Sequence, residues 1–336
     1  IHLLGQKSKA FLNTARKKIA RSINAKKEQI IFTSGGTESN NQVLWSQIYN
    51  DKKHIITSSI EHPAITKTLQ VLESFGLSHS LINVNVDGIV CIDQIQKLIC
   101  KNTGLISIML ANNEIGTIQP IKQIAELTKK KGVLLHTDAV QCLGKMELDV
   151  IDLGVDFLSL SAHKFYGPKG VGILYVKNPK DLKPIIIGGD QESGLRGGTE
   201  NLISIIGMGL AAEIASANIE MNIKHLSKLE KQFKSGLKNL KKKIFFNGNQ
   251  SKKLPGLIST SFSGHKSNIL IIKLDQANMY VSNGAACGSG NITPSNVLKA
   301  LGHDNLRNLS TLRFSFGKTN SSKDIISLIN QLQKII

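Results

Sequence analysis

Residues 157–170 read FLSLSAHKFYGPKG, a short strand-forming run followed by a polar loop that contains His163 and Lys164. Runs of the same kind recur along the first half of the chain, separated mostly by longer stretches with helical periodicity. Such alternation of short strands and helices predicts an α/β domain with a mainly parallel sheet. The other runs lie at residues 29–34, 54–60, 105–110, 133–137 and 171–176.

The pattern changes after about residue 200. A long amphipathic stretch over 201–240 predicts one or two connecting helices. Short strands and helices alternate irregularly beyond it, which favours a smaller α+β domain. In a chain of 336 residues we therefore expect a large α/β domain over 1–210 and a small domain over 211–336.

Composition narrows the class of protein. The net charge is +18, but only five of the 42 basic residues are arginine, which leaves 42 − 5 = 37 lysines. Lysine does not bind phosphates through two parallel hydrogen bonds as arginine does. Aromatic residues, on which bases stack, make up only 5% of the chain. A solvated basic surface is therefore favoured over a dedicated nucleic-acid site. No apolar run is long enough for a membrane span, and a soluble protein is expected. The cysteines form neither a disulfide framework nor a metal site by spacing; they are Cys91, Cys100, Cys142 and Cys287.

Polar clusters follow five of the predicted strands. Ligands of open parallel sheets bind outside the carboxyl ends of the strands, so these clusters predict one pocket at that edge. The clusters are GGTESN (35–40), EHPA (61–64), NNEIG (112–116), DAVQ (138–141) and HKFYG (163–167).

Two of these clusters indicate a cofactor. A desolvated lysine forms Schiff bases, and Lys164 follows a strand. Asp138 also follows a strand, where it either caps a helix or pairs with a pyridinium nitrogen. A lysine and an acid in those roles are what pyridoxal phosphate requires. The glycines and threonine of residues 35–37 form either an anion site at a helix N-terminus or an ordinary turn.

Further polar residues have two interpretations each. His62 is suited to stack on a planar ring, and Asn113 and Gln141 to hydrogen-bond a phenolic oxygen, but each also suits a loop residue that satisfies the backbone. GLRGGTEN (194–201) indicates a second phosphate site or a contribution to the same site in a neighbouring subunit. Arg313 lies in an apolar strand and needs either a substrate carboxylate or a protein acid as partner.

The stretch SNGAACGSG (282–290) sets Cys287 among small residues. Such residues lose much conformational entropy on folding, so a thiol that only needed burial would not be placed there. A flexible tether for a reactive thiol explains the composition better.

Seven ordered motifs extend over most of the chain: TSGGTESNN, EHPA, NNEIGTIQPI, HTDAVQ, SAHKFYGPKGVG, GLRGGTEN and GAACGSG followed by PSNVLKALG. Together they resemble the cysteine desulfurases of the NifS/IscS type, which are class-V aminotransferases. The resemblance implies the pyridoxal-phosphate-dependent transferase fold of type I, with a mainly parallel seven-stranded sheet and a small C-terminal domain carrying the cysteine loop.

The resemblance also implies roles for single residues. Lys164 would be the Schiff-base lysine, Arg313 with Asn113 would bind the substrate, and Cys287 would be the nucleophile that receives sulfur, activated by a charged His62. No metal is implied. The remaining cofactor contacts would be made by Gly36, Thr37, His62, Asn113, Asp138, Gln141, Ser161 and His163, with Thr199 coming from the partner subunit of a homodimer.

The implied activity is conversion of L-cysteine to L-alanine with sulfur transfer for iron-sulfur cluster assembly or tRNA thiolation. Partners would be a scaffold protein or tRNA-thiolation enzymes, in the cytoplasm or in an organelle. Selenocysteine lyase is an alternative. Relatives have a segment ahead of IHLLGQ that lines the active site, and they have a glycine and an arginine where GGDQES has Asp190 and Ser193. An impaired relative that binds scaffold proteins or RNA is therefore a further alternative.

Overall fold

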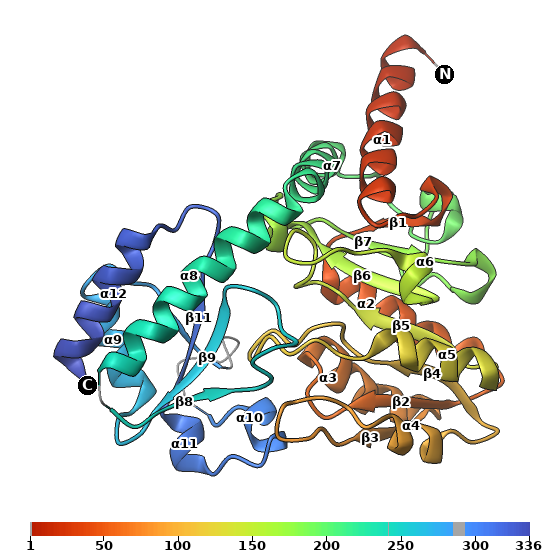
Figure 1. Cartoon of the computed structure of the whole chain (residues 1–336). Coiled ribbons are helices and arrows are strands. Elements are labelled where there is room, and N and C mark those ends of the chain that lie inside the picture. Colours follow the sequence, from red (N-terminus) through yellow and green to blue (C-terminus); the bar gives the residue numbers. More distant parts are fainter. Residues whose placement is uncertain (1, 241, 285–292) are drawn as a thin grey trace. The chain divides into compact units, whose positions relative to one another are not determined.

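The structure, a computed structural model, describes residues 2–240, 242–284 and 293–336 (Figure 1). The chain divides into two compact units. Unit 1 comprises Ile1–Ile82, Cys91–Leu110 and Gln119–Ile219, and unit 2 comprises Asn83–Val90, Ala111–Ile118 and Glu220–Ile336. Two short segments from the first half of the sequence thus belong to the C-terminal unit.

Unit 1 is an α/β layer structure. Its central sheet has seven strands in the order β1-β7-β6-β5-β4-β2-β3. The neighbours from β6 to β3 are parallel, whereas β7 is antiparallel to both β1 and β6. The predicted mainly parallel sheet is therefore confirmed. The strands are β1 (Ile30–Thr33), β2 (His54–Ser58), β3 (Ser78–Ile82), β4 (Thr103–Ser107), β5 (Leu134–Asp138), β6 (Phe157–Ser161) and β7 (Gly172–Val176).

Helices bury the apolar surface of this sheet. Leu44 of α2 and Ile65 and Leu69 of α3 pack in one cluster with strand residues such as Ile55 and Phe157, and all five are almost fully buried. Burial of this kind contributes about 1.5–3 kcal/mol for each large apolar side chain. The helices are α1 (Leu3–Ser22), α2 (Gly36–Ser46), α3 (Pro63–Leu72), α4 (Ile92–Leu98), α5 (Ile121–Lys131), α6 (Val150–Leu153) and α7 (Leu202–Ala217).

Unit 2 is built on an antiparallel sheet in the order β10-β11-β9-β8. Phe233 of α8, Leu274 of α9 and Leu332 of α12 pack with Phe262 and Phe314 of the sheet. The elements are α8 (Ile219–Asn239), β8 (Ile244–Asn247), β9 (Leu257–Phe262), α9 (Ser267–Asp275), β10 (Ser282–Asn283), α10 (Asn296–Ala300), α11 (Asn305–Leu309), β11 (Thr311–Ser315) and α12 (Ser322–Ile335).

The two early segments are fixed within unit 2 by specific bonds. Asn249 donates through its backbone N–H to the carbonyl of Asp87 at 3.0 Å. Thr117 pairs with Lys253 in an isolated antiparallel bridge. These contacts explain why residues 83–90 and 111–118 are part of the C-terminal unit.

No single helix in the described part of the chain is long and apolar enough to cross a membrane. The helices α7 and α8 meet that requirement only when they are taken together.

Candidate functional site

The loops that follow four strands of unit 1 leave the sheet at one edge. Strands β2, β4, β5 and β6 are parallel, and β1 runs in the same direction as β6 because both are antiparallel to β7. Gly36, His62, Asp138 and Lys164 lie at the ends of β1, β2, β5 and β6 or within a few residues after them. These residues are distant in sequence but are brought to the same edge.

A cavity of about 370 Å³ lies where α2 begins. The N-cap of α2 is Gly35, which has no side chain to bond the first N–H groups of the helix. Backbone N–H groups and the helix dipole make such an end favourable for a phosphate. The lining is Ser34, Gly35, Gly36, Thr37, Glu38, Ser161, His163, Lys169 and Gly170.

The loop before α2 lies very close to its neighbours. A Cβ atom added at Gly36 would be only 2.6 Å from Cγ2 of Val140. A Cβ at Gly172 of β7 would be 2.7 Å from Cα of Gly35. Both approaches are too short for a real Cβ, so glycine at these positions keeps the anion-binding end of α2 against the sheet.

Asp138 is held in a fixed position at the end of β5. Its Oδ2 accepts a hydrogen bond of 2.6 Å from Nδ2 of Asn40, and its Oδ1 accepts one of 3.0 Å from the Val140 N–H. Burial raises the pKa of Asp138 above its ordinary value, while these bonds and the nearby His62 and Lys164 act in the opposite direction. A buried acid next to a cation site fits the nitrogen of a protonated pyridine ring.

His62 is the N-cap of α3. Its Nδ1 accepts a hydrogen bond of 3.0 Å from the Ala64 N–H, so that nitrogen carries no proton. Burial lowers the pKa of His62, with Lys164 lowering it further and Asp138 raising it. Burial therefore favours the neutral imidazole over the charged form expected from the sequence. The mutual influence of the three groups places them in one cluster.

Ser161 and His163 line the cavity together. His163 Nδ1 lies 3.0 Å from Oγ of the buried Ser161. Burial, Lys164 and Lys169 all lower the pKa of His163. Together with Thr37, these side chains offer hydroxyl and N–H groups to an anion.

Glu61 is a buried carboxyl group directly before His62. Its oxygens accept hydrogen bonds from the Met109 N–H at 3.0 and 3.1 Å and from the Ser58 hydroxyl. Burial raises its pKa to about 8. Glu61 thereby joins the end of β2 to the segment after β4 and fixes the backbone that carries His62.

Arg313 and Asn113 both belong to unit 2. Arg313 lies on β11, and its Nη1 donates a hydrogen bond of 3.0 Å to the backbone carbonyl of Asn113. The neighbouring Glu114 has its pKa raised by burial, while Ser295 and Arg313 lower it. The Ser295 hydroxyl donates to Oε2 of Glu114 at 2.6 Å. The guanidinium is thus positioned by the 111–118 segment.

Two further expected residues lie in loops of unit 1. Gln141 is half-buried in the loop after β5, and Thr199 is exposed in the loop before α7. Cys287 lies outside the described residues. The next cavity along unit 1, of about 210 Å³, includes Gly198, Thr199 and Asn201 in its lining.

Two residues of the site were missed from the sequence. Asn40 lies four residues after Gly36, one helical turn away on the same face of α2, and this spacing is the signal that could have indicated it. Glu61 directly precedes His62, but a single acid in a loop gives no sign that it is buried.

The residues of unit 1 fit pyridoxal phosphate: an open helix N-terminus for its phosphate, a buried acid for its ring nitrogen, and an imidazole and a lysine nearby. The family model for class-V aminotransferases matches residues 1–328. The chain belongs to this family, in its cysteine desulfurase branch. A "Cysteine desulfurase IscS" of Clostridium botulinum is 41% identical over 341 residues, covering 100% of this chain and 86% of the relative.

Other relatives of this desulfurase agree. The mitosomal cysteine desulfurase of Encephalitozoon cuniculi is 40% identical, over 98% of this chain and 77% of its own length. A solved structure described as a NifS-like protein superposes with a TM-score of 0.93 at 35% identity, covering 99% of this chain and 89% of that one. The sequence-based predictions of family, fold type and pyridoxal-phosphate dependence are confirmed.

Proposed function

We propose that this desulfurase takes sulfur from L-cysteine, releases L-alanine and carries the sulfur as a persulfide on Cys287. The observation that supports the cofactor chemistry most directly is the cluster of Asp138, His62 and Lys164 at the same sheet edge as the open N-terminus of α2.

The residues of the cluster would have different tasks. The end of α2 with Thr37 and Ser161 would hold the phosphate, and the neutral His62 would lie on the ring. Asp138 would keep a proton on the ring nitrogen. The bound cofactor supplies an electron sink through its protonated ring. Lys164 would attach the cofactor and remove the proton from Cα of the substrate.

The sulfur transfer needs a thiolate. The Cys287 thiolate attacks the substrate sulfur, so an S–S bond forms as the C–S bond breaks, and the carbon gains a proton to give alanine. A free cysteine has a pKa of about 8.5. Burial favours the neutral form of His62, and a neutral imidazole would suit the role of accepting the thiol proton. This assignment comes from the sequence, since Cys287 lies outside the described residues.

Arg313 is proposed to bind the carboxylate of cysteine. Its guanidinium is oriented through the carbonyl of Asn113, and an oriented guanidinium can form two parallel bonds to a carboxylate. The side chains of Asn113 and Gln141 are proposed to contact the phenolic oxygen of the cofactor.

A homodimer is proposed as the working form. Helix α7 exposes an apolar stripe at helical spacing: Ile203 is 86% exposed, Leu210 50% and Ile214 47%. An exposed stripe of this kind is typical of a surface that another protein covers. Thr199 lies just before α7, so a partner covering the stripe would bring its own Thr199 near this interface. This arrangement supports donation of Thr199 to the partner's phosphate site.

The cellular role is proposed to be sulfur supply for iron-sulfur cluster assembly or tRNA thiolation, with a scaffold protein or thiolation enzyme as acceptor. A cytoplasmic location is proposed, with an organelle as the alternative, since one relative is mitosomal. Cofactor binding is assigned to residues 1–210 and the cysteine loop to residues 211–336.

The test combines absorbance with product analysis. Protein reconstituted with pyridoxal phosphate is expected to be yellow, and Lys164→Ala to lose that colour. Cys287→Ser should stay yellow but form no alanine from cysteine and no persulfide by mass spectrometry. Cys91→Ser, which changes a different thiol that the structure shows to be exposed, is the matched control and should remain active. Full activity in Cys287→Ser would contradict the assignment of Cys287 as the nucleophile. Wild-type protein that stays colourless after reconstitution would contradict the cofactor site.

A further inference from the structure

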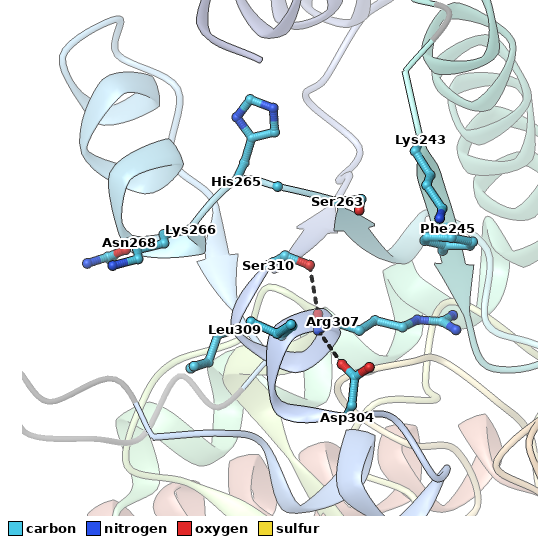
Figure 2. Close-up of a pocket in the computed structure, with 12 residues that line it drawn as sticks. Lys243, Phe245, Ser263, His265, Lys266, Asn268, Asp304, Arg307, Leu309 and Ser310 are labelled. Carbon is cyan, nitrogen blue, oxygen red and sulfur yellow. Dashed lines mark hydrogen bonds between the residues drawn. The ribbon is translucent and has the colours of Figure 1, made fainter.

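A second cavity, of about 760 Å³, lies within unit 2 and has no part in the proposed reaction (Figure 2). It is formed by β8, by the turn between β9 and α9, and by α11. Its volume is in the range of ligand-binding clefts. The lining is Lys243, Phe245, Ser263, Gly264, His265, Lys266, Asn268, Asp304, Leu306, Arg307, Leu309 and Ser310.

The lining is strongly basic. Lys243, Lys266 and Arg307 face one acid, Asp304, so the lysine, arginine and aspartate side chains sum to a charge of 3 − 1 = +2. Among the described residues, the ion pairs include none of these three cations. Asp304 is already engaged as the N-cap of α11, where its Oδ1 accepts the Arg307 N–H at 2.7 Å. The cavity therefore attracts negative charge.

The aromatic ring in the cavity is covered by cations. The guanidinium carbon of Arg307 lies 4.8 Å from the centre of the Phe245 ring, and Nζ of Lys243 lies 5.8 Å from it. In Figure 2 the two groups lie on opposite sides of the ring. Stacked cations stabilise such a ring but leave no open face for a nucleic-acid base.

Arg307 also forms hydrogen bonds to another side chain of unit 2. Its Nε and Nη2 donate to Oδ1 of Asn247 at 3.2 and 2.7 Å. The edge of the guanidinium that would bind a phosphate is therefore already hydrogen-bonded to Asn247. Lys243 and Lys266 are exposed, so their ammonium groups are accessible to carboxylates presented along a flexible chain.

The rest of the lining suits a polypeptide. Leu306 is 83% exposed, and Leu309 lies beside it on α11, so apolar side chains have a surface to contact. The N-terminus of α9 also lines the cavity, and its N-cap, Lys266, makes no side-chain hydrogen bond to it. The helix dipole adds positive potential there.

We propose that this cavity docks an acidic segment of a partner protein, with carboxylates between Lys243 and Lys266 and apolar side chains on Leu306. The association is independent of cofactor binding and of sulfur transfer, so it can be measured without either activity.

The test is fluorescence polarisation with a labelled eight-residue peptide of alternating glutamate and leucine. Because the whole chain is basic, a matched control is needed. Lys243→Gln/Lys266→Gln removes two charges from the cavity, and Lys224→Gln/Lys228→Gln removes two from exposed positions of α8 outside it. Each exposed ion pair between a lysine and a peptide carboxylate contributes about 0.5–1 kcal/mol. The first double variant should therefore bind the peptide roughly 5- to 30-fold more weakly, and the affinity of the second should fall by less than about twofold.

Ser263→Glu places a carboxylate at the exposed edge of the cavity and should weaken binding as well. Equal loss in the two lysine pairs would overturn the proposal, because attraction would then come from overall charge. The proposal would also be overturned if a 12-nucleotide RNA lost affinity with the cavity pair while the peptide did not. Unchanged circular dichroism in all variants shows that the fold is kept.

Discussion

The replacement Glu61→Gln is expected to remove part of the pH dependence of stability. The folded protein raises the pKa of Glu61 from 4.5 to about 8 by burial. Between these values the unfolded chain carries a carboxylate and the folded chain a protonated carboxyl. The folded state thus binds more protons, and its stability falls as the pH rises through this window. Glutamine resembles the protonated form and does not titrate.

The size of the effect follows from the shift. A proton bound only by the folded state changes the free energy of unfolding by 1.36 kcal/mol per pH unit, or about 2 kcal/mol between pH 6 and 7.5. For a chain of this size that corresponds to about 3 °C in Tm. The Tm of the wild type should therefore fall by about 3 °C relative to Glu61→Gln over this range, as measured by thermal unfolding.

The control is Glu126→Gln, which replaces an exposed glutamate of α5 and should leave the pH dependence unchanged. A Tm difference between the wild type and Glu61→Gln that stays constant from pH 6 to 7.5 would refute the reasoning. Above pH 8 the difference is expected to level off.

Three further predictions concern the cofactor loop and its support. Gly36→Ala should weaken pyridoxal-phosphate affinity about tenfold in an absorbance titration. The added Cβ would be 2.6 Å from Cγ2 of Val140. The additional change Val140→Ala should therefore restore part of the lost affinity. Arg16→Ala breaks a buried pair with Glu192, whose oxygens lie 2.6 and 2.7 Å away, and should cost about 3–5 kcal/mol in urea unfolding; an unchanged midpoint would contradict this. Ser193→Gly should stabilise the protein by up to about 1 kcal/mol, because glycine adopts the left-handed backbone region without the strain of a side chain. Ser193 lies in that region, with φ +59°. A lower Tm of the variant would contradict this prediction.

Most of the sheet could be predicted because its strands are apolar. The six runs identified from the sequence correspond to β1, β2, β4, β5, β6 and β7. Strand β3 was missed because it is an edge strand in which only Ile82 is fully buried and Ser78 and Ser80 are polar. Strand β8 was missed because its apolar residues are only partly buried, and only Asn247 of its residues is buried.

The candidate site could be predicted where strand order alone determines position. Loops after parallel strands meet at one edge, so the grouping of His62, Asp138 and Lys164 followed from topology. The charge state of His62 did not, because burial is a property of the fold. The bonds of Asn40 and Glu61 were also missed, since each acts on a neighbouring group rather than on a ligand.

The membership of segments 83–90 and 111–118 in unit 2 has a consequence for synthesis on the ribosome. Asn113 accepts its bond from Arg313, 200 residues later, and Asp87 from Asn249, 162 residues later. At about 5–20 residues per second, the first of these partners emerges roughly 10–40 s after Asn113. Both segments therefore lack these two contacts during most of translation, so the C-terminal unit can complete its fold only after synthesis of the chain is nearly finished.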